Sequence, residues 1–348
     1  MPRVVALFRK SSYSPAQHRT NDTAILDDTL AHFVAAGWAV ERIDEAVLDA
    51  AARDDGGAVP EAVPADADLY LSMCQGPATA RLLGLEAAGA RLINRPSSVL
   101  GCHRHRLVPA LAAAGVPFPA TDVLDLATAD AATVAASPVV RAASAAGGRV
   151  WIKRGDVHAE RADDVVAVPA ADAAGAAAEF RARGIGRIAL QADVAGPVIK
   201  FYGVADGRFF RWYDAAAGLD GPRPVVDETQ LRALAFAAAR ALGLEVFGGD
   251  VALPAPDAPV LIDLNDWPSF APFRAEAAAA IATYALTRVD DPAALTRIDE
   301  PAGLARVDAS LARGRAAADA QHGLPFRTSD GASRRVRSAA SYAYDELT

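Results

Sequence analysis

GGDVAL at residues 248–253 and LIDLNDWPSF at residues 261–270 are the two stretches that say most about the fold of this chain. Each reads as a strand, and the short link between them predicts a β-hairpin. Asp263 and Asn265 are two positions apart, so they share one face of their strand, and the intervening apolar residues point into a core. The hairpin is therefore expected to present oxygen-bearing side chains on one face only.

A metal site is the simplest use for that polar face. With Asp250 on the paired strand, two carboxylates and the Asn265 amide oxygen are expected to converge. Such an all-oxygen set suits one or two Mg²⁺ ions that keep waters and bridge phosphate oxygens. The alternative is a solvated strand end with ordinary acidic residues. Asp266 is a candidate for a further ligand, but a surface position is expected for it.

Lysine usage singles out three further positions. The chain has 35 basic residues, of which only Lys10, Lys153 and Lys200 are lysines. Lys and Arg are not interchangeable where a compact point charge must fit a tight site. Each remaining lysine is therefore a candidate site residue, and the alternative is that the three were left by chance.

The middle of the chain offers groups that could contact a nucleotide. Lys153 ends an apolar strand and precedes a loop, where it can neutralise phosphates as a point charge. Gln191, Asp193 and Val194 follow another apolar strand. A segment of this kind can offer main-chain groups to an adenine edge and a carboxylate to ribose hydroxyls.

Alternating strands and helices over the first 95 residues predict a parallel α/β lobe. A helix is expected over 96–111, followed by strands, two hairpins and two long helices. Four regions are expected: an N-terminal α/β substrate lobe at 1–95, a central lobe at 96–190, a C-terminal lobe with the metal site at 191–290, and a helical or irregular tail at 291–348.

Composition narrows the class of protein. The 348 residues allow two or three packed lobes, although 84 of them are alanines that are neutral between core and exposed helix. The net charge of −8 argues against nucleic-acid and anionic-membrane partners. No apolar stretch reaches the ~20 residues of a membrane helix. Two cysteines cannot make a disulfide framework and no secretory signal is visible, so a cytoplasmic protein is expected.

Several familiar motifs are missing from the sequence. None of the lysines follows a glycine, so there is no phosphate-binding GxxxxGK[ST] loop, and no GxGxxG follows the first strand. The run HRHR at 103–106 looks like a metal tract, but the alternating arginines disfavour a cation. Cys102, just before this run, is expected only to pack.

Taken in order, these elements resemble the ATP-grasp superfamily over roughly residues 1–285. The shared features are an α/β lobe, a helix after INRP, a strand ending in lysine, a QADV-type hinge and the GGD…IDLN hairpin. The resemblance implies an ATP-grasp fold, α/β and α+β in class, with a parallel α/β lobe before it. It also implies ATP between two α+β lobes and Mg²⁺ on Asp250, Asp263 and Asn265.

Within the superfamily, the chain is most similar to the inositol tris/tetrakisphosphate kinases. The strand IKFYGV at 199–204 and the metal strand at 262–270 carry this similarity, with Ser269 where that family has glycine. It implies catalytic roles for Lys200, Arg211 and His158. The implied ATP-binding residues are Arg104, Lys153, Gln191, Asp193 and Val194, and the first lobe would contact substrate through Lys10, His18, Arg19 and Arg95.

Three functions follow from these features. The main prediction is a kinase that transfers the γ-phosphoryl group of ATP to a small anionic metabolite. Its catalysis would depend mainly on positioning the reactants and neutralising phosphate charge. The alternative is a carboxylate–amine or carboxylate–thiol ligase that works through an acyl-phosphate, as in the glutathione-synthetase-like and glutamate-ligase-like branch. The stretch 215–226 lacks the Arg-x-Asn segment and Gly-Gly turn of many such ligases. The third function is a non-catalytic ATP-binding regulator. For the tail at 291–348, the sequence leaves open two roles, covering the substrate site and forming a homodimer.

Overall fold

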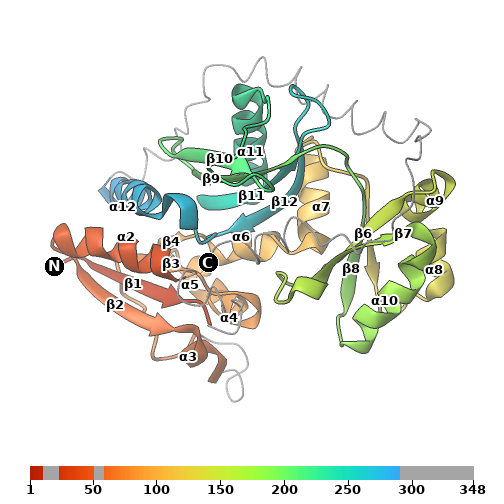
Figure 1. Cartoon of the computed structure of the whole chain (residues 1–348). Helices are drawn as coiled ribbons and strands as arrows, with labels where there is room; N and C mark the ends of the chain where they lie inside the picture. The colour runs from red at the N-terminus through yellow and green to blue at the C-terminus, as the bar shows by residue number, and fades with distance from the viewer. Residues whose placement is uncertain (11–22, 51–58, 291–348) are drawn as a thin grey trace.

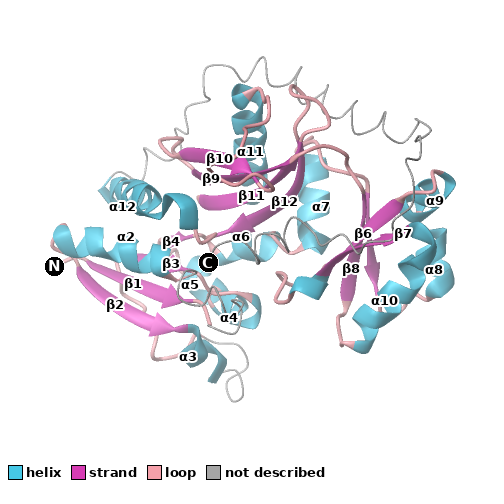
Figure 2. Ribbon diagram, in the orientation of Figure 1, coloured by secondary structure: helices cyan, strands magenta, loops and turns pink. Residues whose placement is uncertain are grey.

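The computed structural model describes residues 1–10, 23–50 and 59–290 of the chain. Within these ranges, three four-stranded sheets form three lobes (Figures 1 and 2). His18, Arg19 and the tail at 291–348 lie outside the described residues, so their predicted roles are not addressed. Among the described helices, none combines the length and apolar character needed to cross a membrane.

The N-terminal lobe is a parallel sheet in the order β2-β1-β3-β4. Its strands are β1 (Arg3–Phe8), β2 (Ala39–Asp44), β3 (Leu69–Ser72) and β4 (Leu92–Ile93). Its helices are α2 (Ala24–Ala35), α3 (Glu45–Ala50), α4 (Gly76–Arg81) and α5 (Leu83–Ala87). The four middle residues of β1 are apolar and fully buried, as expected for a parallel strand covered on both faces.

The central lobe carries an antiparallel sheet in the order β5-β8-β6-β7. Its strands are β5 (Thr121–Asp125), β6 (Arg149–Arg154), β7 (Val165–Pro169) and β8 (Arg187–Ala192). Its helices α8 (Ala131–Ala136), α9 (Pro138–Ala145) and α10 (Ala173–Ala182) cover one face of the sheet in Figure 1. The segment before β5 forms α6 (Pro96–Gly101) and α7 (Arg104–Ala113), and α7 packs Leu107 and Leu111 into the core of the C-terminal sheet. The single helix expected over 96–111 is wrong, because the chain breaks at Cys102 and His103, where His103 takes an extended conformation.

The C-terminal lobe is an antiparallel sheet in the order β10-β9-β11-β12. It contains β9 (Val198–Val204), β10 (Phe210–Asp214), α11 (Glu228–Leu242), β11 (Val246–Ala252), β12 (Val260–Asp266) and α12 (Arg274–Asp290). Helix α11 buries an apolar face on the sheet, against a core that includes Phe201 and Phe247. Its ends are fixed by the Asp227 side chain, which accepts the N–H of Gln230, and by Gly243 in the left-handed conformation.

The first and last lobes are joined by a buried amide. The Asn94 Nδ2 group donates to the Val246 carbonyl at 2.7 Å, and its Oδ1 accepts the main-chain N–H groups of Glu245 and Val246 at 2.7 and 2.9 Å. The Trp267 indole N–H donates to the Ile93 carbonyl at 3.0 Å. These bonds place the end of β12 against the N-terminal lobe, so residues that follow the metal strand lie between lobes.

Candidate active site

Two glycines bring three strands of the C-terminal sheet into close contact. A Cβ on Gly249 would overlap the Asp263 carbonyl oxygen and lie 2.8 Å from the Phe201 ring, and one on Gly248 would lie 2.8 Å from the Phe201 carbonyl oxygen. Glycine therefore fits where a larger residue would push the strands apart. Immediately after this pair, Asp250 stands opposite Asp263 on β12.

On its other side, Asp250 stands opposite Lys200 on β9, so one row of charged residues crosses the three strands. Lys200 Nζ lies 3.0 Å from Asp250 Oδ1. Burial alone would lower the pKa of Lys200, but the Asp250 carboxylate outweighs it and raises that pKa above its ordinary value. The Lys200 ammonium is therefore held in its charged form.

Two cations from outside the C-terminal sheet lie against β12. Arg104, at the start of α7, places Nη2 2.8 Å from Asp263 Oδ2 and donates through Nη1 to the Arg154 carbonyl at 2.8 Å. Lys153, near the end of β6, donates from Nζ to the Ile262 carbonyl at 2.9 Å. The structure thus brings together five of the residues singled out in the sequence, on strands and helices of two lobes.

Burial and charge act in opposite directions at this junction. Burial lowers the pKa of Lys153 to about 8, and the nearby Arg104 adds to the effect, while Asp263 and Asp250 oppose it. Burial would raise the pKa of Asp263, but Arg104 and Lys153 outweigh it and hold that pKa below its ordinary value. Asp263 is therefore ionised at neutral pH, and Lys153 is close to its midpoint in mildly alkaline solution.

The donor set on the hairpin fits Mg²⁺. Asp250 and Asp263 supply carboxylates from facing positions, and Asn265 lies on the same strand face, opposite Gly248, which has no side chain. Hard oxygen donors of this kind suit a small divalent cation that retains waters. The surrounding cations Arg104, Lys153 and Lys200 supply the positive charge that phosphates require.

The predicted nucleotide-contacting segment lies at the end of β8. Gln191 is buried in that strand, and Asp193 and Val194 follow in the link to β9. Asp193 is engaged by the protein: Arg149 Nε donates to it at 2.8 Å and the Trp151 indole N–H at 2.7 Å. These contacts fix the end of β8 where the central lobe passes into the C-terminal lobe.

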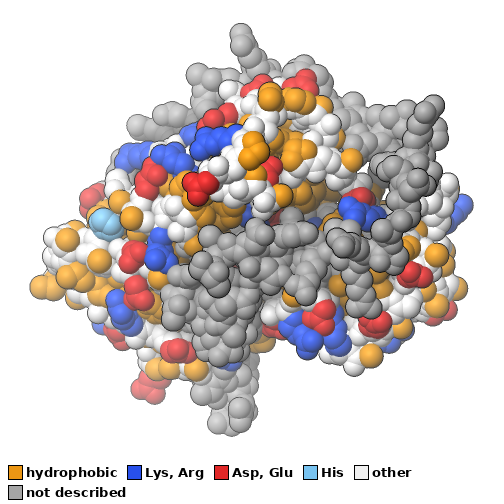
Figure 3. Space-filling view, viewed as in Figure 1, with side chains coloured by type: hydrophobic (Ala, Val, Ile, Leu, Met, Phe, Trp, Pro, Cys, Tyr) orange, Lys and Arg blue, Asp and Glu red, His pale blue; other side chains and the backbone are white. Residues whose placement is uncertain are grey.

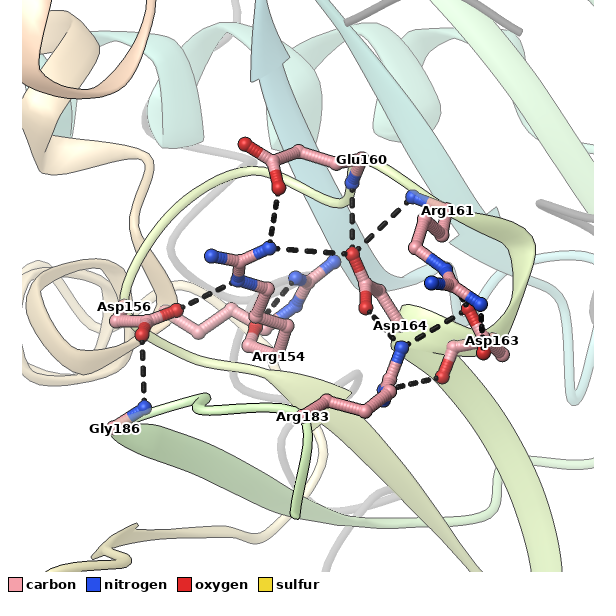
Figure 4. A network of polar contacts seen from close by, with 9 residues as sticks. Arg154, Asp156, Glu160, Arg161, Asp163, Asp164, Arg183 and Gly186 are labelled. Atoms are coloured by element: carbon pink, nitrogen blue, oxygen red, sulfur yellow. Dashed lines mark hydrogen bonds and ion pairs between the residues drawn. The ribbon is translucent and has the colours of Figure 1, made fainter. Parts of the chain in front are cut away.

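A charge network shapes the loop that follows Lys153 (Figure 4). Arg154 pairs through Nε with Asp156 at 2.9 Å and through Nη1 with Glu160 at 2.6 Å. The buried Asp164 accepts the main-chain N–H of Glu160 at 2.9 Å and pairs with Arg183 Nη1 at 2.8 Å. The loop therefore has a defined path over the central sheet, set by ion pairs rather than by apolar packing.

Other predicted residues are placed near different partners. His158, in the loop, has Nε2 3.0 Å from Asp266 Oδ1. Arg211 on β10 is paired with Glu276 of α12. Arg95 precedes α6, with its guanidinium next to Gly243. The main-chain N–H of Lys10 donates to Glu45 Oε2 at 3.2 Å.

Sequence reasoning missed two buried acids. Asp266, expected at the surface, is 1% exposed. Glu45 directly follows β2 and is fully buried, and this burial raises its pKa to about 7. The only signal for Glu45 was its place just after a strand, because the carboxyl ends of parallel strands are where such lobes bind ligands.

Basic and acidic side chains are interspersed on the described surface of the face shown in Figure 3. The positive charges gathered at the site therefore contrast with a mixed surface and with a net charge of −8. Electrostatic attraction of an anion would depend on the local set of cations, since the whole chain is acidic.

No protein-family model and no curated protein matches the sequence. Solved structures match over most of it. A RimK-domain ATP-grasp protein from Sphaerobacter thermophilus is 20% identical, with 82% of this chain and 99% of that chain covered and a TM-score of 0.56. The D-alanine–D-alanine ligase from Bacillus anthracis, in complex with ATP, is 14% identical, with 83% and 96% covered and a TM-score of 0.56.

The ATP-grasp ligase PsnB, in complex with a minimal precursor, Mg and ADP, is 17% identical, with 83% of this chain and 98% of that chain covered and a TM-score of 0.52. A parallel α/β lobe followed by two antiparallel α+β lobes is thus a shared architecture. The chain has the ATP-grasp fold, which confirms the fold predicted from the sequence. Identities this low speak to the fold alone, and the inositol phosphate kinase branch stays a prediction.

Proposed function

We propose that the chain is an ATP- and Mg²⁺-dependent ligase that activates a carboxylate as an acyl-phosphate and joins it to an amine or a thiol. The observation that carries the proposal is the row Lys200–Asp250–Asp263, completed by Arg104 of α7 and by Lys153 of the central sheet. Two of the similar structures are of ligases, one in complex with ATP and one with Mg and ADP. They favour the ligase alternative over the kinase that the sequence placed first.

The charge of each residue at the site determines its proposed role. Asp250, Asp263 and Asn265 would hold the metal ion, which supplies neutralisation of phosphate charge when bound. Arg104 and Lys153 would hold the inner phosphates of the nucleotide, and Lys200 would lie toward the γ-phosphate. Gln191, Asp193 and Val194 would contact the adenosine part, at the link between the two lobes.

The first chemical step would be in-line transfer. A carboxylate oxygen of the acid attacks the γ-phosphorus, the bond to the bridging oxygen breaks, and ADP leaves with that electron pair. The nitrogen of an amine, or the sulfur of a thiol, then attacks the acyl carbon, and the acyl C–O bond breaks. Inorganic phosphate leaves with that electron pair, and the proton of the amine or thiol passes to phosphate or solvent. Cations at the site favour an anionic acid, and Lys10 and Arg95 would contact it from the first lobe, with His158 and Arg211 near the reacting groups.

A trapping experiment tests the reaction class. The full chain is incubated with ATP, Mg²⁺, hydroxylamine and pooled small carboxylic acids, and products are read by mass and ³¹P NMR. Hydroxamate formation with equimolar ADP and phosphate supports the ligase. A stable phosphate ester that forms without any amine would instead establish the kinase, and nucleotide binding without turnover would establish a regulator.

A matched pair of variants shows whether turnover belongs to this site. Asp263→Asn removes a metal-binding carboxylate and is expected to abolish ATP turnover. Asp257→Asn removes an exposed carboxylate on the same hairpin and is expected to leave turnover unchanged. Turnover that survives in Asp263→Asn would contradict the assignment.

The kinase keeps one specific observation in its favour. The stretch 215–226 lacks the Arg-x-Asn segment and Gly-Gly turn found in many ligases of the superfamily. For that reason, the trapping experiment includes polyols and sugar phosphates as a second pool of acceptors. Product formed only from that pool would favour the kinase over the ligase.

A further inference from the structure

A mixed-donor cluster lies beside the hairpin, and His158 is its one member that the proposed reaction also places near the reacting groups. Cys102 sits in the break between α6 and α7, His158 in the loop after β6, and Asp266 at the end of β12. One ligand atom of each residue, a sulfur, a nitrogen and an oxygen, lies within 4.8 Å of the other two. These residues come from three separate segments, so their convergence depends on the tertiary fold.

The cluster is buried and short of hydrogen bonds. The side chain of Asp266 is fully buried and that of His158 is 10% exposed. Both carboxylate oxygens of Asp266 and both ring nitrogens of His158 have no hydrogen-bond partner in the described part of the chain. His158 Nε2 and Asp266 Oδ1 are 3.0 Å apart but are not aligned as a hydrogen bond. These two atoms form an ion pair when the imidazole is protonated, whereas His158 Nδ1 and Asp266 Oδ2 have neither a hydrogen-bond nor an ion-pair partner among the described residues. Buried polar atoms in that state need a partner.

We propose that Cys102, His158 and Asp266 bind a divalent transition-metal ion, with Zn²⁺ the best match to one sulfur, one nitrogen and one oxygen donor. Mg²⁺ and Ca²⁺ take oxygen donors, whereas Zn²⁺ is bound by thiolate, imidazole and carboxylate groups. The Cys102 thiol, which donates to the Ser98 carbonyl at 3.6 Å, would lose its proton to become a ligand. Three protein ligands leave a fourth position for water.

The neighbouring histidine and arginine do not block this site. His103 is buried, and its ring lies 5.4 Å from the His158 ring, with Nε2 lacking a hydrogen-bond partner in the described structure. The guanidinium of Arg104 pairs with Asp263. Its charge is therefore matched by a carboxylate other than Asp266.

The ion would connect the loop after β6 to the end of the metal strand. Asp266 lies three positions after Asp263, and His158 lies in the loop held by the Arg154 network. A metal bound between them would fix that loop against β12, independently of nucleotide. The site is separate from the Mg²⁺ site, and its existence does not depend on the proposed ligase activity.

Cobalt spectroscopy of the full chain tests the site directly. The protein is stripped with a chelator and titrated with Co²⁺ in the presence of excess Mg²⁺, which occupies oxygen-only sites. A bound thiolate gives a sulfur-to-cobalt charge-transfer band in the near ultraviolet, and one equivalent of Co²⁺ is expected to saturate it. Added Zn²⁺ is expected to abolish the band.

The two cysteines form a matched pair for this experiment. Cys74 is buried as well but lies outside the cluster, so Cys74→Ser is expected to keep the band and Cys102→Ser to lose it. Asp266→Asn and His158→Ala are expected to weaken Co²⁺ binding at least tenfold, and Zn²⁺ is expected to raise the Tm of wild type but not of Asp266→Asn. No band in wild type, or an equal band in Cys102→Ser, would overturn the proposal.

Discussion

Lys153 gives a prediction whose size follows from the structure. Burial lowers its pKa to about 8, and its ammonium lies with Arg104 where nucleotide phosphates are proposed to bind. If only the charged lysine binds phosphate, the protonated fraction falls from about 0.76 at pH 7.5 to about 0.09 at pH 9. The association constant for ADP with Mg²⁺ is therefore expected to fall about eightfold, or ~1.3 kcal/mol.

Other groups are not expected to produce this change. The second ionisation of a phosphate lies near pH ~6, so the charge of the nucleotide is constant across the window. The pKa of Lys200 is raised by Asp250, so that lysine stays charged. Isothermal titration calorimetry at both pH values, in buffers of different ionisation enthalpy, measures the affinity and the proton taken up on binding.

The Lys153→Met variant is the control for this titration. It is expected to bind weakly at both pH values, because it has no ammonium to lose. Wild type should approach the variant as the pH rises. Equal affinity of wild type at pH 7.5 and pH 9, or the same eightfold fall in Lys153→Met, would refute the reasoning.

Three further predictions concern stability, each read from urea unfolding. Asp164→Ala leaves the Glu160 N–H without its partner and removes the buried partner of Arg183, which then keeps Asp163 as its acidic partner. It is expected to cost about 3 kcal/mol and to speed proteolysis between 155 and 161, whereas alanine at the half-exposed Asp163 should cost under about 1 kcal/mol. Gly249→Ala should cost about 1–3 kcal/mol through overlap with Asp263, whereas Gly175→Ala, on open space in α10, should be neutral or stabilising. The pKa of Glu45 is raised to about 7, so its stabilising contribution is complete below pH ~4.5 and is lost as the pH rises through 7. Between pH 4.5 and pH 8, the free energy of unfolding of Glu45→Gln should therefore rise relative to that of wild type by up to about 3 kcal/mol.

The sequence predicts local features of the site well and distant ones poorly. The sequence could predict the grouping of Asp250, Asp263 and Asn265, because strand alternation and a short hairpin determine which side chains share a face. The pairing of Arg104 with Asp263 joins residues that are 159 positions apart, so no local pattern contains it. The β7 strand was missed because it is a five-residue run next to alanine-rich sequence.

Burial of polar residues was the other failure, and it has the same physical origin. Asp266 ends an alternating strand and looks solvated in the sequence, but the bond from the Trp267 indole to the Ile93 carbonyl holds the end of β12 against the first lobe. The helix expected over 96–111 breaks at Cys102 and His103, directly after Gly101, and His105 in the next turn is bonded to the Gly155 carbonyl of a distant loop. The burial of Asp266 and the Arg104–Asp263 pair both arise where separate segments of the chain meet, and His158, beside Asp266, is among the buried groups without a hydrogen-bond partner in the described residues.

The charge pairs in this structure explain how a buried row of ions can be stable before any ligand binds. Lys200 neutralises Asp250, and Arg104 neutralises Asp263, so each carboxylate proposed for the metal is matched by a cation proposed for phosphate. A metal ion alone would have to compete with those cations, and a nucleotide alone would have to compete with those carboxylates. Bound together, the metal and the phosphates replace both partners at once, so the site favours the metal–nucleotide complex over either component. The same pairing explains why removing one member of a buried pair should lower the free energy of unfolding more than removing an exposed charge does.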